Sequence, residues 1–200
     1  MKLVIATTNK GKLREIVDIL SSDRPPVALQ LIPLSELPPI VEPEETGLTF
    51  AENARLKALY YARATGLPCV ADDSGIEIAA LDNLPGVHSA RWEGTNYADK
   101  FRRIYEILAQ RGLPTSPARF VCHVALAHDD RIAFEAEGVV EGRIAPEPRG
   151  TNGFGYDPIF YYPPFGATLA EIDLTRKATV SHRGRAFGVL AKYLSSRGKT

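Results

Sequence analysis

The sequence predicts an α/β fold, because short apolar runs typical of buried strands alternate with segments of helical periodicity. Residues 3–6 form such a strand run, and apolar residues from Leu13 to Leu20 then fall on one side of a helix. Two more strand runs, 120–127 and 131–136, flank Asp129-Asp130 and predict a β-hairpin. Strand, helix and hairpin patterns in one chain indicate mixed α/β structure.

The remaining elements follow in order along the chain. Strands are predicted at 27–32, 67–71 and 76–78, a proline-containing connection covers 33–43, and 139–144 extends the sheet beyond the hairpin. A helix from Thr49 to about Ala64 begins with a capping box, Thr49 with Glu52, and ends at Gly66. Further helices are predicted at 97–110 and from Ser181, as the N-cap, to about 194.

Composition limits the class of protein. Basic and acidic side chains both number 24, so nothing global indicates a nucleic acid or an anionic membrane as partner. Cys69 and Cys122 lie in apolar runs and suit buried thiols in a reducing compartment. No apolar run approaches the ~18 residues of a transmembrane helix, and the apolar start of the chain is too short for a signal peptide. We therefore expect a cytoplasmic protein.

The stretch from Val70 to Gly75 places two carboxylates directly after an apolar strand run. Successive strand residues point to opposite faces, so Asp72 and Asp73 should not share one site if the backbone stays extended. Carboxylates where a chain leaves a sheet suit Mg²⁺ or general-base work on a water. An Asx-type turn is the structural alternative, with the strand resuming at Ile76.

Two polar segments could meet a phosphate. The segment 7–12 joins a strand to a helix start, where free N–H groups and the helix dipole favour an anion, and Lys10 and Lys12 add positive charge. It lacks the spacing of a Walker loop. Asn53 and Lys57, four residues apart, share one face of the next helix. Solvent-exposed lysines are the alternative in both segments.

A second dense stretch, 150–160, interleaves glycines with aromatic residues. Its backbone can approach a ligand closely, and Phe154 or Tyr156 offers a flat face to a nucleobase, with Asp157 as an acceptor for base or sugar. The alternative is a glycine-rich turn with its aromatics in the core. His182 and Arg183 open the last helix, where a cation needs an anion or carboxylate as partner. His123 is interpreted as a hydrogen-bonded sheet histidine.

Six motifs occur in the order and spacing of one known family. They are Thr7-x-Asn9-x-x-Lys12, Glu44-Glu45-Thr46-Gly47, Ala71-Asp72-Asp73-Ser74-Gly75, Ser89-Ala90-Arg91, Gly153-Phe154-Gly155-Tyr156-Asp157-Pro158 and Ser181-His182-Arg183-Gly184. Together they make the chain resemble the inosine/xanthosine triphosphate pyrophosphatases in their bacterial form, from residue 3 to about 194. Two positions depart from the family pattern: Arg176 stands where an acidic residue is frequent, and Trp92 where a tyrosine is common.

The resemblance implies both a fold and an activity. The fold would be a single domain, residues 1–200, with two lobes around a long twisted central sheet and the active site in the cleft between them. The activity would be Mg²⁺-dependent hydrolysis of ITP, dITP and XTP to the monophosphate and pyrophosphate, which clears these deaminated purine nucleotides from the pool. The family's members are homodimers.

The resemblance also assigns residues to roles. Asp73 would be the general base for the attacking water and, with Glu44, a metal ligand. The triphosphate would be held by Thr7, Asn9, Lys12, Lys57 and Ser74. Phe154 would stack on the purine, and the nucleoside pocket would be lined by Asp157, Lys177, His182 and Arg183. The other motif residues that we expect at the substrate are Thr8, Lys10, Gly11, Gly155 and Tyr156.

Selection for a 6-oxo purine would come from donors at the His182-Arg183 turn, which satisfy the carbonyl and leave adenine's amino group facing donors. Such an unpaired contact costs about 1–3 kcal/mol. Two alternatives remain open. One is a Maf-like pyrophosphatase that acts on other modified nucleotides, and the other is a non-catalytic nucleotide sensor.

Overall fold

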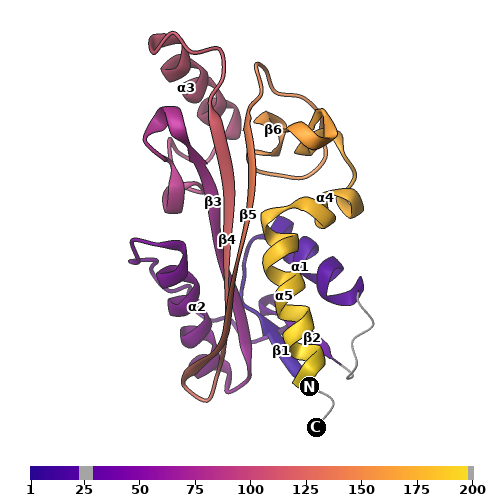
Figure 1. The fold of residues 1–200 in the computed structure, drawn as a ribbon. Helices are drawn as coiled ribbons and strands as arrows, with labels where there is room; N and C mark the ends of the chain where they lie inside the picture. Colours follow the sequence, from indigo (N-terminus) through magenta and orange to yellow (C-terminus); the bar gives the residue numbers. More distant parts are fainter. Residues whose placement is uncertain (23–28, 198–200) are drawn as a thin grey trace. The chain divides into compact units, whose positions relative to one another are not determined.

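The computed structural model describes residues 1–22 and 29–197 (Figure 1). Its helices and strands, in chain order, are β1 (Lys2–Ile5), α1 (Lys10–Ser22), β2 (Gln30–Pro33), α2 (Phe50–Thr65), β3 (Cys69–Ile78), α3 (Tyr97–Gln110), β4 (Pro117–His128), β5 (Arg131–Ile144), β6 (Phe160–Tyr162), β7 (Ala167–Thr168), α4 (Leu174–Val180) and α5 (His182–Arg197). The described strands form a seven-stranded sheet in the order β2-β1-β3-β4-β5-β6-β7. The predicted α/β class is confirmed.

The sheet is mixed. β1 pairs in parallel with β2 and with β3, whereas β6 pairs antiparallel with both β5 and β7. The predicted hairpin is confirmed: β4 and β5 are joined at Asp129 and Asp130, which have φ values of 51° and 60°. Positive φ at both central residues is what a two-residue hairpin turn requires, and Asp tolerates it better than most residues.

The described residues divide into two compact units. The first includes those within 1–73, 122–138 and 182–200, and the second comprises 74–121 and 139–181. β3, β4 and β5 each contribute residues to both units.

In the first unit, apolar residues pack on both faces of the strands. Leu3 and Ile5 of β1 belong to a cluster with Ile16 of α1 and Phe187 of α5, whereas Val4 belongs to a cluster with the buried alanines of α2. This alternation follows from the period of two along a strand. Figure 1 shows α1 and α5 beside one another and α2 across the strands from them.

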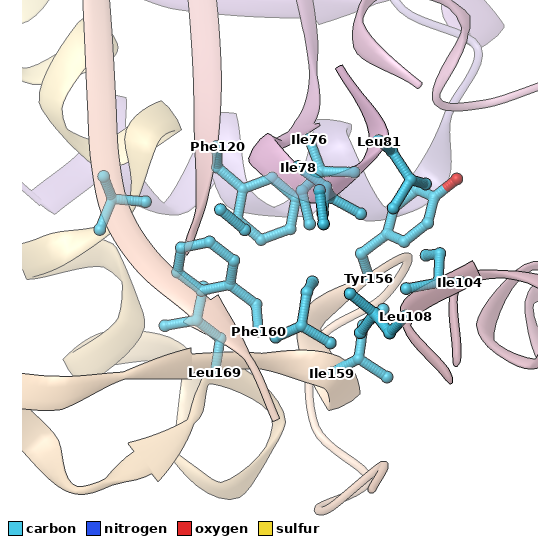
Figure 2. Packing of buried hydrophobic residues seen from close by; sticks show 14 of the residues in the cluster. Ile76, Ile78, Leu81, Ile104, Leu108, Phe120, Tyr156, Ile159, Phe160 and Leu169 are labelled. Atoms are coloured by element: carbon cyan, nitrogen blue, oxygen red, sulfur yellow. The ribbon is translucent and has the colours of Figure 1, made fainter. Parts of the chain in front are cut away.

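In the second unit, one cluster draws on strands, helix and loops (Figure 2). Ile76 and Ile78 of β3 lie in it, and the rings of Phe120 and Phe160 are 4.6 Å apart between centroids. Tyr156, from the glycine-rich stretch, is also a member of this core.

Several sequence predictions are corrected. β3 runs unbroken through residues 72–75, so the predicted interruption is wrong, because the carboxylates find partners without the chain leaving the sheet. β5 is one strand rather than two segments, and α4 was not predicted. β2 begins at Gln30; residues 27–28 of the predicted strand lie outside the described residues. No described helix has the length and apolar character needed to cross a membrane.

The predicted helix boundaries of α2 are confirmed. Thr49 and Glu52 form the reciprocal capping box, and Gly66 ends the helix with φ 66°. These local signals fix where α2 begins and ends, and therefore which of its side chains can face β3.

Candidate functional site

Two consecutive carboxylates of β3 point to opposite faces of the strand, as predicted. Asp72 and Asp73 are 2% and 5% exposed, so both are withdrawn from water. The neighbouring apolar residues show which way each one points: Val70 belongs to the cluster with α1 and α5, and Ala71 to the cluster with α2. Asp72 therefore faces α1 and α5, and Asp73 faces α2.

Asp73 is held by two residues of α2. The amide Nδ2 of Asn53 donates to Oδ2 of Asp73 at 3.2 Å, and the ammonium of Lys57 lies 3.3 Å from Oδ1. Lys57 also lies 2.5 Å from Oε1 of Glu45. Lys57 is 7% exposed, so the solvent-exposed alternative for this lysine is wrong. The shared helix face of Asn53 and Lys57 is directed at a carboxylate.

The acidic segment before α2 is tied to the same helix. The N–H of Gly47 donates to Oδ1 of Asn53 at 2.8 Å, and Nδ2 of Asn53 donates to the Gly47 carbonyl at 3.3 Å. A Cβ on residue 47 would lie 2.6 Å from Oδ1 of Asn53, so this approach requires glycine. Gly47, which lies two residues after Glu45, is thereby fixed to Asn53 of α2, and this anchors the segment that contains Glu45.

The electrostatics of this face suit a proton acceptor. Burial raises the pKa of Asp73, and Glu45 adds to the rise, while Lys57, Lys12 and Asn53 oppose it without cancelling it. For Lys57, burial lowers the pKa, but Asp73, Asp72 and Glu45 outweigh burial and raise it. Asp73 is thus a carboxylate beside a persistent ammonium, with a pKa moved toward the working range of a general base.

Asp72 lies in a different environment. The ammonium of Lys12 and Nη2 of Arg183 both contact its Oδ2, at 3.3 and 3.2 Å, and Nη1 of Arg183 lies 2.6 Å from Oε2 of Glu15. Burial favours a higher pKa for Asp72, but Lys12, Arg183 and Lys57 reverse this and hold the pKa well below its ordinary range. Asp72 is a fixed anion and a poor base.

Arg183 contacts two carboxylates, and its expected role at the nucleobase stays a prediction. Its side chain is 1% exposed and bridges Glu15 and Asp72. The sequence correctly indicated that a cation at the start of the last helix needs a carboxylate partner, and Asp72 and Glu15 supply two. His182, which precedes Arg183, is 5% exposed. Its nucleoside role stays a prediction.

The segment 7–12 is organised by its own hydrogen bonds. Oδ1 of Asn9 accepts from the N–H groups of Gly11 and Lys12, at 2.9 and 3.1 Å, so Asn9 caps α1. Two of the helix N–H groups on which the phosphate prediction relied are therefore occupied. Thr7 accepts from the N–H of Asn9 at 3.2 Å.

The other side chains of this segment differ in their surroundings. The hydroxyl of Thr8 donates to Oε1 of Glu42 at 3.2 Å, Lys10 is exposed, and the Lys12 side chain keeps 16% of its surface exposed beside Asp72. Lys12 is consequently the lysine of this segment that is both ordered and accessible.

A second group of candidate residues lies in the second unit. Oδ2 of Asp157 accepts from the N–H of Phe154 at 2.8 Å and lies 2.5 Å from Nζ of Lys177. That ammonium is 5.0 Å from the centre of the Phe154 ring. A Cβ on Gly153, which has φ 72°, would collide with Oδ2 of Asp157. Asp157 thus shapes the loop and orients Lys177.

The loop's two aromatic residues differ in burial. Phe154 is partly exposed, whereas Tyr156 is 3% exposed and donates its hydroxyl to the Ser89 carbonyl at 2.9 Å. For Tyr156 the core alternative therefore holds. Gly155 adopts φ 67°, and Ser74 follows Asp73 on β3 with partial exposure; their substrate roles stay predictions.

The donor set for a metal is carboxylate oxygen. No group of three or more His, Cys, Asp or Glu side chains suited to a metal occurs in residues 1–22 and 29–197. Mg²⁺ is compatible with this, because it commonly uses one or two protein carboxylates and takes its other ligands from substrate phosphates and water. Glu44 is exposed, whereas its neighbour Glu45 is joined to Asp73 through Lys57.

Sequence reasoning missed several residues of these groups. Glu15 is three residues beyond Lys12, a spacing that gives both one helix face, but its partner Arg183 is 168 residues away. The two free cysteines are buried as predicted, and His123 pairs with Glu135 at 3.0 Å as a sheet histidine.

A family model places the chain among known proteins. The model of the Ham1 family matches residues 3–193. The chain belongs to the Ham1 family. This confirms the resemblance inferred from the six motifs, and the match spans both units.

Relatives and solved structures agree with the Ham1 assignment. The chain is 48% identical over 184 residues to the dITP/XTP pyrophosphatase of Syntrophobacter fumaroxidans, covering 92% of this chain and 78% of that protein. It is 47% identical over 192 residues to a dITP/XTP pyrophosphatase of Thermus thermophilus, covering 95% and 90%. A HAM1 protein structure from Coxiella burnetii superposes with a TM-score of 0.85 at 42% identity, covering 98% and 99%.

Replacement of Arg183 by lysine tests the buried network of Lys12, Asp72, Arg183 and Glu15. Arg183 contacts Glu15 and Asp72 through two different nitrogens of its planar guanidinium, and the single nitrogen of a lysine cannot reproduce that geometry. Arg183→Lys should therefore lower the free energy of unfolding by about 2–4 kcal/mol. Urea unfolding followed by circular dichroism measures this, and amide exchange of α1 should rise. The exposed Arg185 of the same helix is the matched control, Arg185→Lys. Equal stability of both variants would contradict the network's importance.

Proposed function

We propose that this Ham1 protein hydrolyses dITP, XTP and ITP to the nucleoside monophosphate and pyrophosphate, and so clears deaminated purine nucleotides. Relatives that are 47–48% identical over 92–95% of this chain are named dITP/XTP pyrophosphatases. The single observation that carries the mechanism is Asp73: a buried carboxylate with a raised pKa, oriented by an amide and an ammonium.

In this proposal Asp73 orients and deprotonates the attacking water. Hydrolysis at the α-phosphorus also requires that charge on the phosphate oxygens be neutralised. Lys12 and Lys57 supply the neutralising positive charge. Each is already held in place by a β3 carboxylate, so neither side chain loses further conformational freedom when substrate binds. Asp72 contributes by keeping Lys12 in position and takes no proton.

Mg²⁺ belongs to the same proposal. The carboxylates of Asp73 and of Glu45 or Glu44 would hold it, with phosphate oxygens completing its shell. When bound, it supplies charge neutralisation on the triphosphate. Glu45 is the better placed of the two neighbouring glutamates, because Lys57 already links it to Asp73.

The base would be held by the loop of the second unit. Phe154 offers a partly exposed ring for stacking, and Lys177 lies over that ring as a hydrogen-bond donor fixed by Asp157. Lys177 is the proposed donor of the second unit to a 6-oxo group. Arg183 acts on the base only through its neighbours, since its guanidinium is engaged by carboxylates. We further propose a cytoplasmic homodimer; two free thiols suit a reducing compartment.

The first test is pyrophosphate release from dITP, XTP, ITP, ATP, GTP and modified pyrimidine triphosphates, with Mg²⁺ and with EDTA. We expect metal-dependent release of pyrophosphate from the three deaminated purines and at least about tenfold lower kcat/KM for ATP, because its 6-amino group would face the proposed donor and leave one unpaired polar contact. GTP shares the 6-oxo group, so a lower kcat/KM for GTP would have to come from its 2-amino group. Binding without turnover would identify a nucleotide sensor instead. Preference for modified pyrimidines would identify a Maf-like enzyme.

Replacing Asp73 by asparagine removes the proposed base and keeps the shape of the side chain. Asp73→Asn should reduce kcat by about 10²–10⁴-fold while circular dichroism and the urea midpoint show a folded protein. The control is Asp99→Asn on the surface of α3, whose carboxylate pairs with Arg102. Near-normal hydrolysis by Asp73→Asn would remove this residue from the mechanism.

Two adjacent glutamates are candidates for the metal ligand: the sequence motif assigns Glu44, and the contacts in the structure favour Glu45. Replacing each in turn distinguishes the two assignments. We expect Glu45→Gln to raise the Mg²⁺ concentration for half-maximal rate by about tenfold or more, by analogy with the loss of one metal-site interaction. Glu44→Gln, at an exposed position, should leave it within about twofold. Calorimetric titration of Mg²⁺ into the protein with inorganic tripolyphosphate gives a readout independent of turnover. The opposite ranking would establish Glu44 as the ligand.

A further inference from the structure

Lys100 is a buried lysine of α3 that belongs to none of the six sequence motifs. The residue is 0% exposed, which is rare for lysine. Its ammonium donates to two successive backbone carbonyls, those of Ser89 at 3.0 Å and Ala90 at 2.7 Å. These two residues open the Ser89-Ala90-Arg91 motif, for which the proposed mechanism has no use.

The surroundings of the Lys100 ammonium are aromatic. It lies 4.8 Å from the centre of the Tyr97 ring and 5.8 Å from that of Tyr156, and these two rings meet edge to face at 5.3 Å. Cation–π attraction offsets part of the cost of removing the charge from water. The ammonium is therefore held by carbonyls and rings that come from three separate parts of the second unit.

Ser89 is the point where these parts converge. Its carbonyl accepts both the Lys100 ammonium and the Tyr156 hydroxyl. Its own hydroxyl accepts from the N–H of Ile76 at 2.9 Å and donates to the Gly86 carbonyl at 2.6 Å. Ser89 thus connects β3, the 86–90 turn and the loop that contains Tyr156.

Tyr156 carries this connection into the candidate base-binding loop. Tyr156 stands between Phe154 and Asp157, and the side chain of Asp157 accepts from the N–H of Phe154. A displacement of the Ser89 carbonyl would therefore move Tyr156 and, through the short loop, the ring of Phe154. Lys100 is the second group that donates to that carbonyl.

We propose that Lys100 is a positioning residue for the 153–157 loop: it fixes the Ser89 carbonyl, which fixes Tyr156 and with it Phe154 and Asp157. This inference rests on the proposed function, which assigns that loop to the nucleobase. Lys100 itself touches no substrate. Its loss should weaken recognition of the base and leave recognition of the triphosphate, which we assign to Lys12 and Lys57, unchanged.

Lys100→Met removes the ammonium and keeps a side chain of similar length. We expect KM for dITP and XTP to rise about tenfold, the equivalent of about 1.4 kcal/mol, with kcat changed less than about threefold. Inhibition by inorganic tripolyphosphate, which has no base, should keep its Ki. Arg102→Met, which removes a charge from an exposed side chain of the same helix, is the control and should match the wild type.

Tyr156→Phe provides a second variant, which removes only the hydroxyl donated to Ser89 and decides the question if Lys100→Met fails to fold. It should raise KM in the same direction without changing the Ki of tripolyphosphate. Fluorescence of Trp92, the chain's single tryptophan, which packs against the core of the second unit, reports whether each variant is folded. The double variant should be less than additive, because both changes act on one carbonyl.

Two results would overturn the inference: an unchanged KM in folded Lys100→Met and Tyr156→Phe, or an equal weakening of nucleotide and tripolyphosphate, which indicates general damage. Failure of the proposed function is recognised separately, since wild type and Arg102→Met would then release no pyrophosphate. In that case calorimetric dissociation constants of dITP and tripolyphosphate replace KM and Ki. Lys100→Met and Tyr156→Phe must then weaken the binding of dITP and leave the binding of tripolyphosphate unchanged.

Discussion

The structure of the first unit depends on one constraint: two consecutive carboxylates on a buried, unbroken strand. Extended backbone sends Asp72 and Asp73 to opposite faces, so each carboxylate takes its contacting cations from a different face. A buried charge without a partner costs several kcal/mol, and each face must therefore provide its own. α1 and α5 bring Lys12 and Arg183 to Asp72, and α2 brings Lys57 to Asp73. The cost of burying these charges selects which helix faces can pack on β3.

The same constraint gives two identical side chains different chemistry. Asp72 shares one oxygen between two cations, so it remains ionised and acts as an anchor. Asp73 has one ammonium, one neutral amide and a glutamate nearby, and burial raises its pKa. Environments that push the pKa values of neighbouring carboxyl groups apart assign them to different tasks. The proposed assignment of Asp73 as base and Asp72 as anchor therefore rests on their partners, since the residue types are the same.

Local signals in the sequence were sufficient for much of the fold. The capping box at Thr49, the glycine that ends α2, the Asp129-Asp130 turn and the alternation of the β3 carboxylates each act within a few residues, and each is found in the structure. The sequence could not show that β3 continues past Asp73, because polar residues in a strand are stable only if distant elements supply partners. Arg183 is the clearest case, since Glu15 and Asp72 lie 168 and 111 residues away.

A motif residue can be needed for ligand binding without contacting the ligand. Asn9 uses its side-chain oxygen to cap the start of α1, and Asp157 uses its own to bind Phe154 and Lys177. A residue can belong to a sequence motif because it contacts the ligand directly or because it supports a neighbour that does. A loop or helix start whose polar groups are already satisfied loses less freedom when a ligand binds, so more of the contact energy remains as affinity. In the proposed mechanism, residues such as Asn9 and Asp157 would thus act on the nucleotide by holding Lys12, Phe154 and Lys177 in place before it binds.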